Sequence, residues 1–175
     1  MRHDAYSPIA KALHWIIAVC VVFLVPAGVV MANVPGLDTL YNLHRSVGAL
    51  VMGLMAARVG YRLVNGAPAA YPGLGAAERF ASGAAHAALY ALLIAVPVAG
   101  WAGTSAYGAQ IMVFGLFELP PIMAVDTSPD KAYALQILNV HKVLALTMTA
   151  IAVVHIVAAL RHHFIKRDGV LRRML

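Results

Sequence analysis

The chain has 175 residues, of which 62% are hydrophobic and only 11% are charged. Because a soluble domain carries about 25% charged residues, this composition indicates an integral membrane protein, with room for one domain over residues 1–175. The single cysteine, Cys20, excludes an intramolecular disulfide bond. The net charge of +6 taken alone would permit a nucleic-acid partner, but the distribution of the charges along the chain argues against one.

Four apolar segments follow in chain order, at residues 13–32, 44–64, 84–103 and 139–161. Each has close to the roughly 20 residues that a spanning helix needs. Helices are expected because a backbone in lipid must satisfy its own polar groups. The sequence therefore predicts an all-α membrane protein, built as a four-helix transmembrane bundle, with kinks at Pro26 and Pro97.

Two of the predicted connections are long. Residues 65–82 are rich in glycine, alanine and proline, while residues 104–138 form the longest connection and contain Pro120-Pro121 and several aromatic residues. A connection of that length is often functional. We expect residues 104–138 to fold over the bundle.

The positive charges lie mostly on one side of the predicted bundle. With a cytoplasmic N-terminus, ten lysines and arginines fall on the cytoplasmic side and three on the other side. The ten are Arg2, Lys11, Arg58, Arg62, Arg79, Arg161, Lys166, Arg167, Arg172 and Arg173, and the three are Arg45, Lys131 and Lys142. This bias predicts cytoplasmic N- and C-termini. It also assigns the basic tail to anionic membrane lipid rather than to nucleic acid.

Four histidines fall at two depths of the predicted bundle. His141 and His155 are fourteen residues apart on one helix, so they share a face and are separated by about 21 Å along the axis. His14 shares the inner, cytoplasmic level with His155, and His44 shares the outer level with His141. Two opposed imidazoles at one level are what bis-histidine haem ligation requires. The pattern therefore predicts two haems, one near each membrane surface.

Other interpretations of these histidines stay open. A single small metal ion is disfavoured because the two pairs are about 20 Å apart, and a proton relay leaves the pairing unexplained. His86 also lies at the inner level, where it is an alternative ligand or a partner for a haem propionate or a quinone. His162 follows His155 by seven residues on the same stripe, and is either interfacial or a border of the inner haem or a quinone.

Three basic side chains are candidates for binding haem propionates. Arg58 follows His44 by fourteen residues and therefore falls at the inner level on the same face. A guanidinium there can form a bidentate pair with propionate, or extend to the interface. Arg45 and Lys142 each follow an outer ligand candidate, and either neutralise outer propionates or contact lipid headgroups.

Short sequence pieces, taken in order, add a family resemblance. They are Tyr6-Ser7, Leu13-His14-Trp15, Leu43-His44-Arg45-Ser46-Val47-Gly48, Arg58, His86 with Tyr90 and Pro97, Gly100-Trp101, Ser105-Ala106, Val113-Phe114-Gly115-Leu116, Leu119-Pro120, His141-Lys142-Val143-Leu144 and His155. Their order and spacing resemble the bacterial cytochrome b561 family, within the wider group that includes the cytochrome b subunits of nickel–iron hydrogenases. The resemblance covers nearly the whole chain.

The resemblance implies a protein of the bacterial inner membrane that holds two haems b at His14, His44, His141 and His155. It implies electron transfer between haem and membrane quinone, and one branch of the family resembles superoxide:ubiquinone oxidoreductases. We therefore expect an oxidoreductase with superoxide or another periplasmic donor and ubiquinone as acceptor. The alternative is an electron-transfer subunit docked to a partner protein, a larger dehydrogenase or hydrogenase.

The two substrates are expected at opposite ends of the bundle. Arg45, Lys131 and Lys142 would present positive charge to superoxide on the outer face. Arg79, His86 and His162 are polar groups near the inner haem in an otherwise apolar bundle, and there we expect the quinone.

Overall fold

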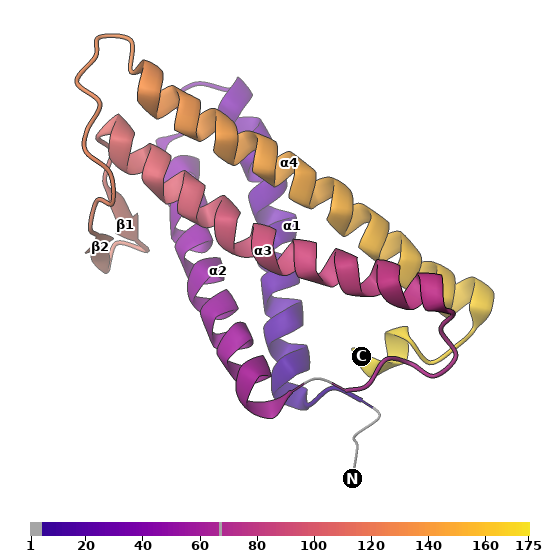
Figure 1. Cartoon of the computed structure of the whole chain (residues 1–175). Coiled ribbons are helices and arrows are strands. Elements are labelled where there is room, and N and C mark those ends of the chain that lie inside the picture. The colour runs from indigo at the N-terminus through magenta and orange to yellow at the C-terminus, as the bar shows by residue number, and fades with distance from the viewer. Residues whose placement is uncertain (1–4, 67) are drawn as a thin grey trace.

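Four long helices make up most of the structure, a computed structural model that describes residues 5–66 and 68–175 (Figure 1). They are α1 (Pro8–Asn33), α2 (Asp38–Asn65), α3 (Ala76–Tyr107) and α4 (Ala132–Leu160), with α4 continuing into a π-helical turn at Arg161–Lys166. All four are long and apolar enough to cross a membrane. The predicted fold class is thus confirmed. Arg2, one of the ten cytoplasmic charges counted above, lies outside the described residues.

The helices extend beyond the predicted apolar segments because the residues that begin and end them lie in the polar sequence on either side. Ser7 accepts a hydrogen bond from the Ala10 N–H at 3.2 Å and caps α1, with proline at the first helical turn. Gly66 and Gly108 end α2 and α3 with positive φ angles of 73° and 86°, a conformation that glycine adopts without strain. Hydropathy alone finds the apolar middle of each helix and misses these ends.

The helices pack as two pairs. α1 lies along α2, α3 lies along α4, and α2 contacts α3. Figure 1 shows the pairs closest together at the end that holds the start of α2 and the end of α3, and splayed apart at the end that holds the start of α1 and the C-terminus. We call the first the hairpin end and the second the terminal end. They correspond to the predicted outer and inner levels.

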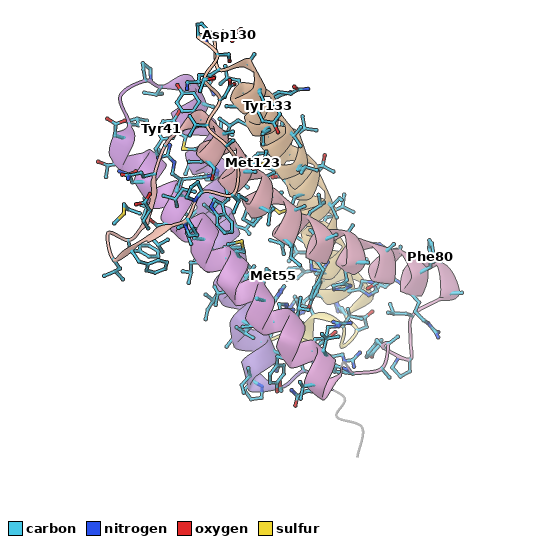
Figure 2. The ribbon with its side chains drawn as sticks, turned by 60° about the vertical axis from the view of Figure 1, so that its left-hand side comes forward. Tyr41, Met55, Phe80, Met123, Asp130 and Tyr133 are labelled. Carbon is cyan, nitrogen blue, oxygen red and sulfur yellow. The ribbon has the colours of Figure 1, made fainter. Side chains whose placement is uncertain are left out.

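Few side chains form a closed core. Ile17, Val51 and Met55 pack α1 against α2, and Met55 is fully buried. Figure 2 shows Met55 on α2 and the exposed Phe80 near the start of α3. The outward apolar side chains are those that lipid would cover.

A short β-hairpin gives the hairpin end its name. Strands β1 (Ile111–Val113) and β2 (Phe117–Leu119) are antiparallel, and the turn has positive φ angles at Phe114 (49°) and Gly115 (72°). Asn-Gly and Asp-Gly are the pairs that strongly indicate a hairpin turn, and Phe-Gly does so only weakly. The sequence pattern therefore predicts no strand here.

Hydrogen bonds hold this hairpin to the bundle. The buried Ser46 hydroxyl accepts from the Phe114 N–H at 2.9 Å and lies 3.1 Å from the Met112 carbonyl. The Trp101 indole donates to the Pro120 carbonyl at 3.0 Å. The expectation that the long connection folds over the bundle is confirmed.

At the terminal end, the segment after the π-helical turn folds back onto the start of α1. The Trp15 indole donates to the Met174 carbonyl at 2.8 Å, and the Tyr6 N–H donates to the Arg173 carbonyl at 3.3 Å. The Lys11 ammonium also donates to the carbonyl of Leu175. These bonds tie the sequence's last residues to the first turns of α1.

Candidate functional site

His44 and His141 face each other at the hairpin end. Their ring centroids are 6.3 Å apart, with the ring planes at 81°. Both line a cavity of about 670 Å³ that is also bordered by Tyr41, Arg45 and Trp101. A metal–imidazole bond is about 2 Å long, so two imidazoles on opposite sides of one iron have centroids about 6 Å apart. The separation and the cavity therefore fit a bis-histidine haem.

The two rings offer nitrogen lone pairs toward such a ligand. The His141 Nδ1 is 2.8 Å from the Val96 carbonyl, which makes Nδ1 the donor and leaves Nε2 unprotonated, the usual state of a metal-binding histidine. The His44 Nδ1 is buried and lies on the α1 side of its ring, near the backbone of Leu24 and 4.0 Å from the position of a Cβ at Gly28. That leaves the His44 Nε2 as the nitrogen available to iron.

Two glycines allow the helices to approach these rings. A Cβ added to Gly100 would lie 3.0 Å from the His141 Nδ1, and one added to Gly28 would lie 3.4 Å from the His44 Cε1. From the sequence, Gly100 is singled out only within the family resemblance, and Gly28 is not singled out. A usable signal was present, because each glycine follows a helix proline closely, Pro26 before Gly28 and Pro97 before Gly100.

Three imidazoles gather toward the terminal end. The His155 and His86 rings have centroids 5.0 Å apart, and the His86 Nδ1 is 2.7 Å from the Ser82 carbonyl. His14, on α1, interacts electrostatically with both. The structure thus brings the expected partners His14 and His155 to one level together with His86, and His14 as the second ligand stays a prediction.

These rings do not converge on a small ion. Over the described part of the chain, no group of three or more histidine, cysteine or carboxylate side chains is arranged to hold one. A histidine pair holding a larger planar cofactor needs no third protein ligand.

Arg58 lies at the inner level, as predicted. Its guanidinium donates to the Ala10 carbonyl at 2.8 Å and lies 5.7 Å from the centre of the Tyr90 ring. Arg62 lies 5.5 Å from the same ring. Both arginines and Tyr90 border a small cavity of about 20 Å³. A role for Arg58 in propionate binding stays a prediction.

The basic groups at the hairpin end differ in their surroundings. Arg45 lines the large cavity, lies 5.6 Å from the Tyr41 ring centre and donates weakly to the Gln110 carbonyl at 3.4 Å. Lys142 is exposed, and Lys131 donates to the Asp126 carbonyl. Of the three, Arg45 is the one that borders the cavity.

The residues expected at a quinone site are at the terminal end. Arg79 is exposed and donates to the Leu74 carbonyl at 3.1 Å, and His162 is buried, with its Nδ1 2.6 Å from the Asp168 carboxylate. Within the described ranges, no hydrogen bond or ion pair joins Arg79, His86 and His162 to one another. Sequence reasoning missed Asp168 because it lies beyond the last span.

Asp168 is ionised in this environment. Partial burial tends to raise the pKa of this carboxyl, but hydrogen bonds from His162 and from the Val170 N–H oppose it, and the net pKa lies below the usual value. The carboxylate is therefore a hydrogen-bond acceptor for His162.

A bundle of four membrane-spanning helices, with opposed histidines across a cavity of this size, defines a membrane cytochrome of the b type. The chain belongs to the prokaryotic cytochrome b561 family, whose family model matches residues 5–175. It is thus an electron-transfer protein of the membrane that binds haem b.

Relatives match along nearly their whole length. Cytochrome b561 homolog 2 of Escherichia coli (strain K12) is 35% identical, over 98% of this chain and 92% of the relative. Cytochrome b562 of Cereibacter sphaeroides is 28% identical, and the probable superoxide oxidase CybB of Yersinia pestis is 26% identical, each over 99% of this chain and 97% of the relative.

Proposed function

We propose that the protein is a di-haem b oxidoreductase that moves electrons from a periplasmic donor, superoxide, to ubiquinone. The observation that carries the proposal is the opposed His44 and His141 pair across the cavity at the hairpin end. A haem held by two histidines would be suited to electron transfer rather than to oxygen binding. When bound, the haems supply the one-electron chemistry.

The chain's own residues hold and orient the two cofactors. His44 and His141 bind one iron, and His14 and His155 bind the other. Arg58 binds propionates at the inner level, and Arg45 and Lys142 do so at the outer level, because guanidinium and ammonium groups pair with carboxylates.

Arg45 supports superoxide as the donor. It is the basic side chain that borders the cavity, and a local positive potential attracts a small anion. The printed name of the Yersinia pestis relative points to the same chemistry. The bias of positive charges supports cytoplasmic termini and a periplasmic hairpin end.

Ubiquinone is bound at the terminal end. Arg79, His86 and His162 are its candidate polar contacts, since a quinone oxygen that gains electrons needs hydrogen-bond donors.

Rapid mixing of the haem-loaded protein with a superoxide pulse tests the proposal. We expect fast haem reduction that superoxide dismutase abolishes, followed by reoxidation on adding ubiquinone-1. Arg45→Gln should slow the reduction and weaken its salt dependence. Lys131→Gln is the matched control, because it removes the same charge from a side chain that does not border the cavity. No fast reduction by superoxide in the wild type removes this donor from the proposal.

A second candidate is an electron-transfer subunit docked to a larger dehydrogenase. It is favoured by the apolar hairpin tip, where Phe114, Leu116 and Phe117 are 48%, 80% and 54% exposed. Gentle purification from native membranes tests it. Retention of a flavin, iron–sulfur or nickel subunit supports docking, and purification of the cytochrome alone with full superoxide:ubiquinone activity opposes it.

A further inference from the structure

The end of α4 is built differently from the rest of the bundle. The helix changes to a π-helical turn at Arg161–Lys166, a form that occurs mostly in single turns and frequently at functional sites. His162 lies in this turn with only 9% of its surface exposed. A buried polar side chain needs a partner.

That partner is Asp168. Arg167 adopts a positive φ of 51° and reverses the chain, so that the Asp168 N–H donates to the His162 carbonyl at 3.2 Å. The Asp168 carboxylate then lies 2.6 Å from the His162 Nδ1. A carboxylate at Nδ1 fixes the ring's orientation and leaves Nε2 for a second partner.

The neighbouring charges are already paired. Glu78, from the start of α3, accepts from Lys166 and lies 3.5 Å from the Arg161 guanidinium. Glu78 and Lys166 also act electrostatically on the His162–Asp168 pair. Asp168 is therefore the carboxylate in direct contact with the His162 ring.

His162 lies between this polar segment and the inner histidines. It follows His155 by seven residues, about 10 Å along a helix axis. It is therefore positioned between the aqueous side of the terminal end and the level at which the second haem is proposed. His162 is therefore a buried imidazole on the terminal side of that level.

We propose that His162 donates the protons for quinone reduction and that Asp168 is its positioning residue. This inference rests on the proposed function. Two superoxide ions are oxidised to two molecules of dioxygen and supply two electrons, one quinone takes them up, and two protons come from water on the terminal side. Each transfer breaks the N–H bond at the His162 Nε2 and forms an O–H bond at a quinone oxygen. Water then returns the proton to Nε2, while Asp168 holds the ring in place through Nδ1.

The test compares Asp168→Asn with Tyr71→Phe in the haem-loaded protein. Tyr71 is the matched control because its hydroxyl accepts from the Gly169 N–H at 3.4 Å and holds the same turn without a contact to the His162 ring. Haem content, the rate of haem reduction by superoxide, and the rate of reoxidation by ubiquinone-1 are measured from pH 5 to pH 9.

For Asp168→Asn we expect reoxidation to slow about 10- to 100-fold, the usual cost of losing a partner that orients a functional histidine. The KM for ubiquinone-1, the haem content and the rate of reduction should stay near the wild-type values. The dependence of reoxidation on pH should change, and Asp168→Glu should restore part of the rate. Tyr71→Phe should differ from the wild type by less than about twofold, because it keeps the carboxylate.

Equal reoxidation rates and pH profiles in Asp168→Asn and Tyr71→Phe would overturn the inference. His162→Gln provides a second arm if Asp168→Asn loses haem: slow reoxidation with normal haem content supports the inference, and unchanged reoxidation or loss of haem in this variant too overturns it. If ubiquinone-1 does not reoxidise the reduced haems of the wild-type protein at any pH, the proposed acceptor is refuted. This failure of the proposed function is seen in the wild type alone and is therefore distinct from a failure of the inference about His162.

Discussion

Replacing Gly100 with alanine tests whether the fit between α3 and the His141 ring holds an iron ligand in place. The added Cβ would lie 3.0 Å from the His141 Nδ1 and 3.1 Å from Cε1. Contacts this short are rare, so the ring must move by a few tenths of an ångström. That movement would strain the 2.8 Å hydrogen bond between Nδ1 and the Val96 carbonyl.

The expected magnitude follows from the tolerance of metal sites. Metal–ligand distances are held to about 0.2 Å, and disturbing a group that orients a ligand costs about 10- to 100-fold in affinity. This corresponds to about 1.4–2.7 kcal/mol of binding free energy. Alanine itself favours the helix by about 0.5–1 kcal/mol over glycine, so the bundle should still fold.

The measurement is the number of haems retained per protein chain, determined by absorbance after dilution and extended washing. Gly100→Ala should lose one haem, that of the hairpin end, while keeping the other. Gly53→Ala is the control, because nothing lies within 4 Å of a Cβ at Gly53, and Gly28→Ala should be nearly neutral because its nearest atom, the His44 Cε1, is 3.4 Å away. Full retention of two haems with an unchanged spectrum in Gly100→Ala would refute the reasoning.

Three further predictions concern the ligands, the hairpin and an acidic capping residue. His141→Ala and His155→Ala should each keep about half of the wild-type haem, since one ligand pair survives in each; loss of the same haem in both would contradict the pairing. Ser46→Ala should lower the free energy of unfolding by about 1–3 kcal/mol, because a backbone N–H of the hairpin turn loses its buried acceptor, and an unchanged thermal midpoint would contradict this. Hydrogen bonds from Ser128 and from backbone N–H groups lower the pKa of Asp126 to about 2, so its stabilising contribution is complete above pH about 4 and is lost as the pH falls through 2. Proteolysis of residues 108–131 should therefore increase over that interval, and Asp126→Asn should be susceptible at every pH.

The arrangement of the helices was largely predictable from the sequence. Spacing on a 3.6-residue helix puts His141 and His155 on one face, and lipid requires regular helices over the apolar segments. Pairing of His44 with His141 followed from depth alone, and their rings do face each other. Long-range periodicity is a strong signal because every residue of a span contributes to it.

Local features at the ends of the helices were not predictable. The hairpin depends on two positive φ angles at Phe114 and Gly115, and short strands outside the membrane have no sustained pattern. Asp168 meets His162 because the chain reverses after a π-helical turn, and hydropathy does not report such a turn. His86 lies against the His155 ring, a contact that depends on how α3 rotates about its own axis.

The chain's two tryptophans are distributed between the two levels. Trp15 has its ring 5.4 Å from that of His14, whereas Trp101 borders the cavity that His44 and His141 line. Haem absorbs the light that indole emits, so each indole is a fluorescent donor that bound haem quenches, most strongly when the haem is at the indole's own level. Trp15→Phe and Trp101→Phe would leave one emitter each. Cofactor insertion could then be followed in real time, without an external label, by comparing how strongly the emission of each indole falls.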